Sequence, residues 1–303
     1  MITVIGSINM DLVISAERTP SAGETIKGHS FATIPGGKGA NQAVACARCG
    51  SHVYMVGKVG DDGFGNELTK ALESGGIDTS HISVSKETST GVAVITIVNK
   101  DNTIILSPGA NGLVLPCDID SAHEAIASSG CLLLQHEIPM QTIKYIINKY
   151  KGKVKIFLNP APMYPIEDEI LKELDYFLPN QSEAAILTGI TIEDEISAFK
   201  AIDILLNKGI KYPIITMGSL GVAYWNGEEK KFCPAFGVNV VDTTAAGDTF
   251  TGALASCLSR GCDMDYSVKF AQMAAALSTT KYGAQSSIPT LKDVEDGLAG
   301  YEN

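Results

Sequence analysis

The chain has 303 residues, of which 45% are hydrophobic and 19% charged, so it can bury a sizeable core. This length fits two domains, or one large α/β domain with an appendage. The 23 basic and 34 acidic residues give a net charge of −11, which disfavours nucleic acid and anionic membranes as partners. Backbone amides could still bind a phosphate locally.

Targeting signals are not apparent in the sequence. The N-terminal stretch "MITVIGSINM" lacks the basic region and the small-residue cleavage pattern of a secretory signal. No apolar run approaches the roughly 18 residues that are needed to span a bilayer. The seven cysteines are scattered and odd in number, which is typical of a reducing compartment. We therefore expect a cytoplasmic protein without a membrane partner.

The first third of the chain predicts strands and helices in alternation. "MITVIGS" reads as a short buried strand, and residues 36–50 are glycine-rich and then helical, with Gly50 as a stop. "HVYMVGKVGDD" predicts a strand and turn, and "FGNELTKALESGGI" a helix that ends at its glycine pair. We interpret Asp61 and Asp62 as a turn and helix cap rather than a metal site.

Two β-rich segments interrupt this alternation. In residues 88–108, "GVAVITIV" and "TIILS" flank "NKDN", which predicts a β-hairpin whose turn is supplied by Asn and Asp. Residues 11–35 are also β-rich and irregular. Together these segments predict a small sheet that projects from the main domain as a β lid.

After residue 109 the alternation becomes regular. Short apolar runs at 131–135, 155–162, 176–180 and 213–219 are separated by helical stretches such as "MQTIKYIINKY" and "EISAFKAIDILLNKG". Such βαβ units predict an α/β fold with a mostly parallel central sheet and helices on both faces. We assign residues 1–10, 36–87 and 109–303 to this core and residues 11–35 and 88–108 to the lid. Ligands in such folds bind at the carboxyl ends of the strands.

The stretch "VVDTTAAGDTF" (240–250) contains the most informative residues. It predicts a turn from a strand into a helix, with Asp248 in or near the first helical turn. Asp248 could be a simple N-cap, worth about 1 kcal/mol. However, the small residues before it would let a ligand approach free amides at the positive end of the helix dipole. An anion hole beside a carboxylate suits phosphoryl transfer to an alcohol, with the carboxylate as the base.

Other chemical signatures are missing or weak. There is no phosphate loop of the form G-x-x-x-x-G-K-[ST], and no G-x-G-x-x-G follows the first strand, which disfavours a nicotinamide-dependent dehydrogenase. Cys46 and Cys49 form a lone C-x-x-C inside a predicted helix. We interpret this pair as ordinary buried cysteines, because no second pair or suitably spaced histidine accompanies it.

"GGKGANQA" and "VDTTAAGDTF" resemble the two signatures of the ribokinase/PfkB family of carbohydrate kinases. Further motifs follow in the expected order along nearly the whole chain: "GSINMD", "PSAGET", "KVGDDGFG", "STGVAV", "GAN", "LNPAP", "PNQSEA", "TMGSLG" and "KYGAQSS". The resemblance implies a ribokinase-like fold and ATP-dependent phosphorylation of D-ribose at its 5-hydroxyl to give ribose 5-phosphate.

The resemblance also implies roles for individual residues. Asp248 would be the general base, beside an anion hole of Ala245, Ala246 and Gly247. The sugar would contact Asn9, Asp11, Gly37, Lys38, Asn41, Glu137 and Asp248. ATP would contact Asn180, Thr216, Met217, Gly218, Ser219, Leu220, Gly221, Gly247 and Gln272.

Two cation sites follow from the same resemblance. Glu183 would position Mg²⁺ through water, although its position at the start of a helix is also explained by the helix dipole. A monovalent cation, expected to be K⁺, would lie beside the anion hole at Asp242, Thr244, Ser278, Lys281, Gly283 and Ser287. The lid would cover the sugar and join two chains into a homodimer.

Two departures from the family pattern leave the sugar open. Met10 is larger than the small residue expected between Asn9 and Asp11, and His136 stands before Glu137 where an apolar residue is expected. The substrate could therefore be 2-deoxyribose, another furanose or a nucleoside. A non-catalytic sugar or nucleotide sensor on the same fold ranks lower, because both the base and the anion hole are present.

Overall fold

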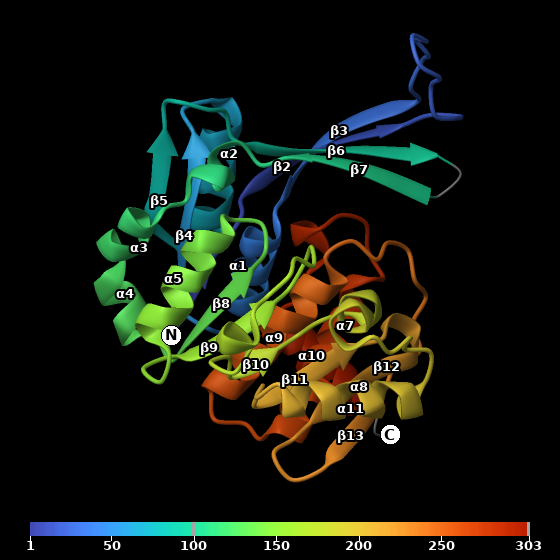
Figure 1. Cartoon of the computed structure of the whole chain (residues 1–303). Coiled ribbons are helices and arrows are strands. Elements are labelled where there is room, and N and C mark those ends of the chain that lie inside the picture. Colours follow the sequence, from blue (N-terminus) through green and yellow to red (C-terminus); the bar gives the residue numbers. More distant parts are fainter. Residues whose placement is uncertain (99–100, 302–303) are drawn as a thin grey trace.

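The computed structural model, shown in Figure 1, describes residues 1–98 and 101–301. Its main body is built on a sheet of nine strands. In spatial order these are β13 (Lys230–Pro234), β12 (Gly221–Trp225), β11 (Tyr212–Thr216), β10 (Tyr176–Phe177), β9 (Lys155–Asn159), β8 (Cys131–Gln135), β1 (Ile2–Ile5), β4 (Val53–Gly60) and β5 (Asp78–Ser85). Neighbouring strands are parallel from β11 to β5, and β12 and β13 add an antiparallel edge. The predicted mostly parallel sheet is confirmed.

Helices cover both faces of this sheet, because successive side chains of its strands point into two separate cores. In β8, Leu132 and Leu134 belong to one core and Cys131 and Leu133 to the other. The first core includes α3 (Pro116–Ser121), α4 (His123–Ser128), α5 (Met140–Tyr150), α6 (Asp168–Leu171), α7 (Gln181–Thr188) and α8 (Glu195–Asn207). The second includes α1 (Lys38–Arg48), α2 (Gly63–Ser74), α9 (Ala246–Ser259), α10 (Met264–Ser278) and α11 (Leu291–Tyr301). None of the helices in the described part of the chain could cross a membrane.

A second sheet projects from this body (Figure 1). It has four strands in the order β3 (Ser30–Gly36), β2 (Asn9–Ser15), β6 (Gly91–Val98) and β7 (Asp101–Ser107). The two hairpin pairs are antiparallel, whereas β2 and β6 are parallel. The predicted small sheet is confirmed, although β2 begins at Asn9 and β3 ends at Gly36. Of the predicted turn residues, Asn99 and Lys100 lie outside the described residues, and Asp101 already belongs to β7.

Several local expectations can be compared with the helix ends. α1 ends at Arg48 with Cys49 as its C-cap, so the helix stops just before the predicted stop at Gly50. Asp62 is the N-cap of α2 and accepts the Gly65 amide at 2.8 Å, which confirms its interpretation as a cap. Cys46 and Cys49 are buried free thiols, as expected.

The order of the strands places the ligand crevice. From β1 the chain adds β4 and β5 on one side, and β8 to β11 lie on the other, so the strand order reverses beside β1. Parallel sheets bind ligands at the carboxyl ends of the strands at such a point. The small sheet leaves the body there, because β2 follows β1 after a short link at residues 6–8.

Candidate active site

The N-terminus of α9 presents free amides in an unusual backbone conformation. Its N-cap is Ala245, whose φ of +59° makes it the sole non-glycine residue with positive φ in the described ranges. Such strain costs on the order of 1 kcal/mol and is often found at functional sites. The amides of Gly247 and Asp248 have no acceptor among the described residues, whereas that of Ala246 donates to Thr243 O at 3.2 Å. The expectation that Ala246 offers a free amide is therefore wrong for this conformation, because the tight turn engages it.

Asp248 is the third residue of α9 and not its cap, so the alternative interpretation as an N-cap is wrong. The residue is 6% exposed, and two side-chain amides from α1 hold its carboxylate. Asn41 Nδ2 donates to Oδ2 and Gln42 Nε2 donates to Oδ1, each at 3.0 Å. Sequence reasoning missed Gln42. Its place directly after Asn41 in "GGKGANQA" was the available signal.

The close approach of α1 and α9 makes this contact possible. A Cβ at Gly252, one turn after Asp248, would lie 2.5 Å from Ala45 Cβ and 2.7 Å from Gln42 O. Only a glycine leaves room for such an approach between helices without a shift of one of them. The glycine therefore helps to bring the amides of α1 within hydrogen-bond distance of Asp248.

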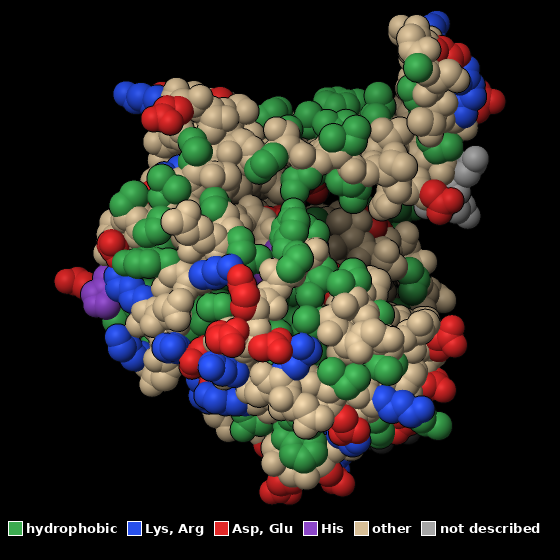
Figure 2. All heavy atoms as spheres, in the orientation of Figure 1, with side chains coloured by type: hydrophobic (Ala, Val, Ile, Leu, Met, Phe, Trp, Pro, Cys, Tyr) green, Lys and Arg blue, Asp and Glu red, His purple; other side chains and the backbone are tan. Residues whose placement is uncertain are grey.

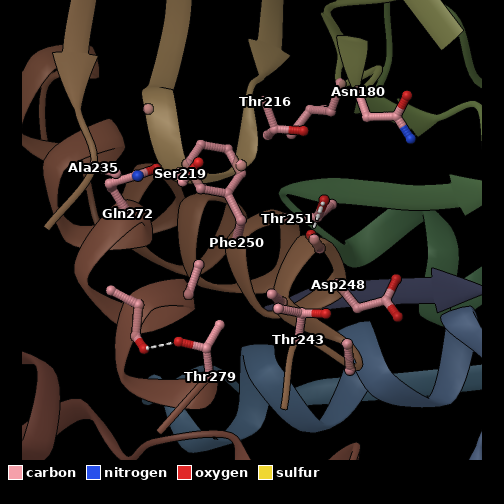
Figure 3. Close-up of a pocket in the computed structure, with 18 of the residues that line it drawn as sticks. Asn180, Thr216, Ser219, Ala235, Thr243, Asp248, Phe250, Thr251, Gln272 and Thr279 are labelled. Atoms are coloured by element: carbon pink, nitrogen blue, oxygen red, sulfur yellow. Dashed lines mark hydrogen bonds between the residues drawn. The ribbon is translucent and has the colours of Figure 1, made fainter. Parts of the chain in front are cut away.

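A pocket of about 870 Å³ opens in front of these amides. Figure 3 shows Asp248 at one end of it and Ser219 and Gln272 at the other. Seven of the nine predicted nucleotide contacts line it: Asn180, Thr216, Gly218, Ser219, Gly221, Gly247 and Gln272. Met217 does not, because its side chain is buried in the apolar core, and Leu220 is not among the lining residues either.

The sequence motifs did not identify the residues that form the other walls of the pocket. The loop after β13 contributes a run of small and apolar residues, and α10 contributes its last turns; these residues are Ala235, Phe236, Gly237, Val238, Val240, Ala275, Ala276 and Thr279. Such a mostly apolar cleft with a few polar groups is typical of a small-molecule site. Its apolar walls suit the flat face of a nucleotide base.

Beyond Asp248, buried charged side chains gather around Lys38. Coulombic interactions join Lys38 to Asp11, Glu137, Glu183 and Asp248. The nearby carboxylates, Asp248 first, raise the pKa of Lys38 against the opposing effect of burial. Burial, reinforced by Glu137 and Asp248, raises the pKa of Asp11 to about 7. Burial likewise raises the pKa of Glu137. Such perturbed groups in a cleft are typical of a functional site.

Backbone and amide contacts hold the remaining predicted sugar residues in place. Asn111 Nδ2 donates to Asn9 Oδ1 at 2.7 Å, and Asn111 Oδ1 accepts the Ile8 amide. Gly37 has φ +90°, and a Cβ there would lie 2.7 Å from Asn9 N, so glycine is required at this turn. Asn41 Oδ1 is buried and has no partner among the described residues. This oxygen is therefore an unused acceptor next to the Asp248 carboxylate.

Neither departure from the family pattern lines the pocket. The Met10 side chain is fully buried in the apolar core. His136 is also buried; its Nδ1 pairs with Pro162 O at 3.0 Å, and burial lowers its pKa to about 4.

Asn180 and Glu183 form a reciprocal cap at the start of α7. Asn180 Oδ1 accepts the Glu183 amide at 2.9 Å, and Glu183 Oε2 accepts the Asn180 amide at 2.8 Å. The structural interpretation of Glu183 is therefore confirmed, but it leaves Oε1 without a partner among the described residues while the residue lines the pocket. In the described ranges no three His, Cys, Asp or Glu side chains are grouped to hold a metal. A single free carboxylate oxygen fits a Mg²⁺ ion that keeps most of its water.

The predicted monovalent-cation residues come from two segments that the structure joins. Asp242 Oδ1 accepts the amide and hydroxyl of Thr244, and Oδ2 accepts the Gly283 amide at 3.0 Å. Burial acts to raise the pKa of Asp242, but these donors together lower it. The hydroxyls of Ser278 and Ser287 each donate to the carbonyl three residues earlier. The joined loops lie beside the start of α9, and an ionised Asp242 suits a cation.

Comparisons with known proteins agree with this geometry. A family model described as "pfkB family carbohydrate kinase" matches residues 1–291. The chain belongs to this family of carbohydrate kinases. Among curated relatives of this PfkB chain, Bacillus subtilis ribokinase is 40% identical over 98% of this chain and 99% of its own length. A deoxyribokinase of Salmonella typhi is 37% identical over 98% of each chain.

Solved structures extend the likeness to three dimensions. Ribokinase from Thermotoga maritima superposes with a TM-score of 0.90 at 38% identity, covering 98% of this PfkB chain and 99% of that chain. Arabidopsis thaliana ribokinase in complex with ribose and ATP gives a TM-score of 0.93 at 33% identity, covering 98% of both chains. The nine-stranded core and the separate small sheet are thus those of ribokinase structures.

Proposed function

We propose that this PfkB kinase transfers the γ-phosphoryl group of ATP to the 5-hydroxyl of D-ribose and releases ribose 5-phosphate. The observation that carries the proposal is the free amides of Gly247 and Asp248 at the start of α9, next to the buried Asp248 carboxylate. Relatives named ribokinase at about 40% identity support ribose as the acceptor.

The chemistry follows from these groups. Asp248 would accept the proton of the primary hydroxyl as that oxygen attacks the γ-phosphorus. The amides at the start of α9 would stabilise the negative charge on the transferred phosphoryl group. ADP would leave through the pocket lined by Ser219 and Gln272. Mg²⁺, when bound near Glu183, would neutralise phosphate charge, and K⁺ beside Asp242 would fix the loop before the anion hole.

The sugar would lie between the small sheet and α1. Asn9 and Asp11 lie on β2, the strand by which the small sheet leaves the body, and Lys38 and Asn41 begin α1. Carboxylate and amide oxygens suit the hydroxyls of a furanose. As a lid, the small sheet would exclude water, which competes with the sugar as phosphoryl acceptor.

We also propose a homodimer through the lid. Large apolar side chains of this sheet are exposed, and Figure 2 shows hydrophobic side chains gathered over it. They are Phe31, Val94, Ile104, Ile105 and Leu106. Exposed apolar patches of this kind are typical of protein interfaces. The seven free cysteines suit a reducing cytoplasm, which is the location we propose.

A second phosphoryl acceptor, from the same class of pentose sugars, is also supported. The relative named deoxyribokinase is almost as similar as those named ribokinase, so 2-deoxyribose is the specific alternative. Other furanoses and nucleosides are less supported. A pocket that hydrogen-bonds the 2-hydroxyl should reject the analogue lacking it by a large factor, on the order of 10⁴.

A coupled assay of ADP release over pentoses, hexoses and nucleosides, with and without K⁺, tests the proposal. We expect the highest kcat/KM for ribose and a stimulation by K⁺. Turnover with no sugar in the panel would refute the kinase proposal. A preference for 2-deoxyribose would leave the chemistry in place and replace the substrate.

A further inference from the structure

A chain of buried side-chain amides runs behind Asp248. Gln42 Nε2 donates to Asp248 Oδ1 at 3.0 Å and to Asn159 Oδ1 at 3.2 Å. Gln42 Oε1 accepts Gln135 Nε2 at 2.7 Å, and Asn159 Nδ2 donates to Leu178 O at 2.8 Å. Gln42 and Gln135 are both fully buried. This network joins α1, α9 and the carboxyl ends of β8 and β9.

From these contacts we propose that Gln42 and Gln135 are positioning residues that aim the Asp248 carboxylate at the acceptor hydroxyl. The inference rests on the proposed kinase function, in which Asp248 is the base. Both glutamines are completely buried, so each would act through Asp248 and not on a substrate. Three residues from three elements, Gln42 on α1, Gln135 on β8 and Asn159 on β9, would thereby specify one rotamer of the base.

The direction of the network is fixed by chemistry. An ionised carboxylate only accepts hydrogen bonds, so Gln42 must turn its amino group toward Asp248. Its carbonyl oxygen then faces Gln135, which must donate in turn. A flipped Gln42 would place its oxygen against the carboxylate and its amino group against that of Gln135. Such buried, unfavourable pairs are costly. Asn159 anchors Gln42 in its donating orientation, because its own amino group is held by Leu178 O and its Oδ1 must therefore accept from Gln42. Gln135 supplies the donor for Gln42 Oε1, while its own Oε1 is buried without a partner among the described residues.

The charged neighbours of Asp248 also influence the orientation of its carboxylate. Lys38 attracts its carboxylate from α1, while Asp11 on β2, Glu137 in the turn after β8 and Glu183 on α7 repel it. These charges alone would favour a carboxylate that turns toward Lys38. Donors at both oxygens, Asn41 on one and Gln42 on the other, oppose that rotation and leave a lone pair on each oxygen for the hydroxyl proton. Correct aim within a fraction of an ångström is what general-base catalysis requires.

Two substitutions at Gln42 test this role. Gln42→Met keeps the length of the side chain but removes the donor, and we expect kcat to fall roughly 10- to 100-fold while KM for ATP stays within about twofold. Gln42→Glu places a second carboxyl group at hydrogen-bond distance from Asp248. Such a pair holds one proton, so the protonated side chain replaces the amide donor in acid and loses it as the pH rises.

For Gln42→Glu we therefore expect kcat at saturating sugar near that of wild type at about pH 5.5, with a progressive fall toward about pH 8. Gln141→Glu is the matched control, because Gln141 is exposed on α5 and the change adds the same charge. Its pH profile should follow that of wild type. Gln135→Met should lower kcat in the same direction as Gln42→Met, since it leaves Gln42 Oε1 without its donor and weakens the hold on the Gln42 side chain.

A folded Gln42→Met variant with kcat within about twofold of wild type would overturn the inference. A Gln42→Glu profile that parallels the control, or that rises with pH, would also overturn it. If Gln42→Met does not fold, Gln42→Glu and Gln135→Met decide the question. Asp248→Asn separates the failure of the proposed function from the failure of the positioning role. If Asp248→Asn keeps its turnover, the assignment of Asp248 as the base fails. If Asp248→Asn loses turnover but the glutamine variants keep it, only the positioning role fails.

Discussion

Replacing Asp248 by asparagine perturbs the proposed chemistry with little change in shape. In the native site both carboxylate oxygens accept amide donors, from Asn41 and from Gln42. The substituted side chain must turn its new amino group toward one of them. Gln42 cannot adapt, because Gln135 and Asn159 fix its amide. Asn41 can, because its Oδ1 is buried without a partner among the described residues, and a flip presents that oxygen to the new amino group.

With Asn41 flipped, the Asp248→Asn variant therefore keeps two hydrogen bonds at position 248. We expect its free energy of unfolding to stay within about 1.5 kcal/mol of wild type, the size of one neutral hydrogen bond. The amide cannot accept the hydroxyl proton at neutral pH, so the general-base contribution is lost. That contribution is typically about 10²- to 10⁴-fold in rate. We therefore expect kcat to fall by roughly this factor, with the Kd for the sugar within about threefold.

A coupled ADP-release assay gives kcat, and isothermal titration with the sugar gives Kd. Thermal unfolding checks that the fold is intact. A variant that keeps wild-type kcat would refute Asp248 as the base. A variant that loses sugar binding by as large a factor as turnover would show that the carboxylate serves mainly to bind.

The remaining predictions address the anion hole, the lid and the sugar pocket. Gly247→Ala should fold normally, because a Cβ there meets no atom within 4 Å. The added methyl group should raise KM for ATP about tenfold or more, because it fills the space proposed for the phosphate. An unchanged KM would argue against this phosphate subsite. Ile105→Lys, at a side chain 73% exposed, should convert a dimer to monomers in sedimentation velocity without loss of thermal stability; a persistent dimer places the interface elsewhere. Since the pKa of Asp11 is about 7, the Kd for the sugar should rise about tenfold per unit below that pH, and Asp11→Asn should abolish this dependence; a flat wild-type profile contradicts the role of Asp11.

Local sequence patterns correctly predicted helices and strands whose ends are set by the residues next to them. β8 and α5 match the predicted runs at both ends, because a continuous apolar run and a helical apolar period are bounded by turn residues. β12 and β13 were not assigned. They form the antiparallel edge of the sheet, and the pairing of β12 with β11 and of β13 with β12 depends on contacts that no local period encodes.

The site shows the same division. Asp248 and Gly247 could be found because small residues before an acid at a helix start are unusual. Gln42 could not be derived from local physics, since its partners Gln135 and Asp248 lie 93 and 206 residues away. Met217 was assigned to the nucleotide by its place in a motif. Within the short turn after β11 its side chain instead points into the core, and only its neighbours line the pocket.

The proposed sugar site also accounts for the carboxylates that are buried close together around Lys38. Asp11 has a folded-state pKa of about 7 against 3.8 for the free side chain, so its ionisation opposes folding. The stability it contributes is complete below about pH 4 and is lost as the pH rises to about 7, a change of about 4 kcal/mol. A sugar whose hydroxyls donate to the ionised carboxylate would recover part of this cost on binding. The unfavourable charge is thus placed where a substrate can relieve it, and substrate binding would stabilise the fold most above neutral pH.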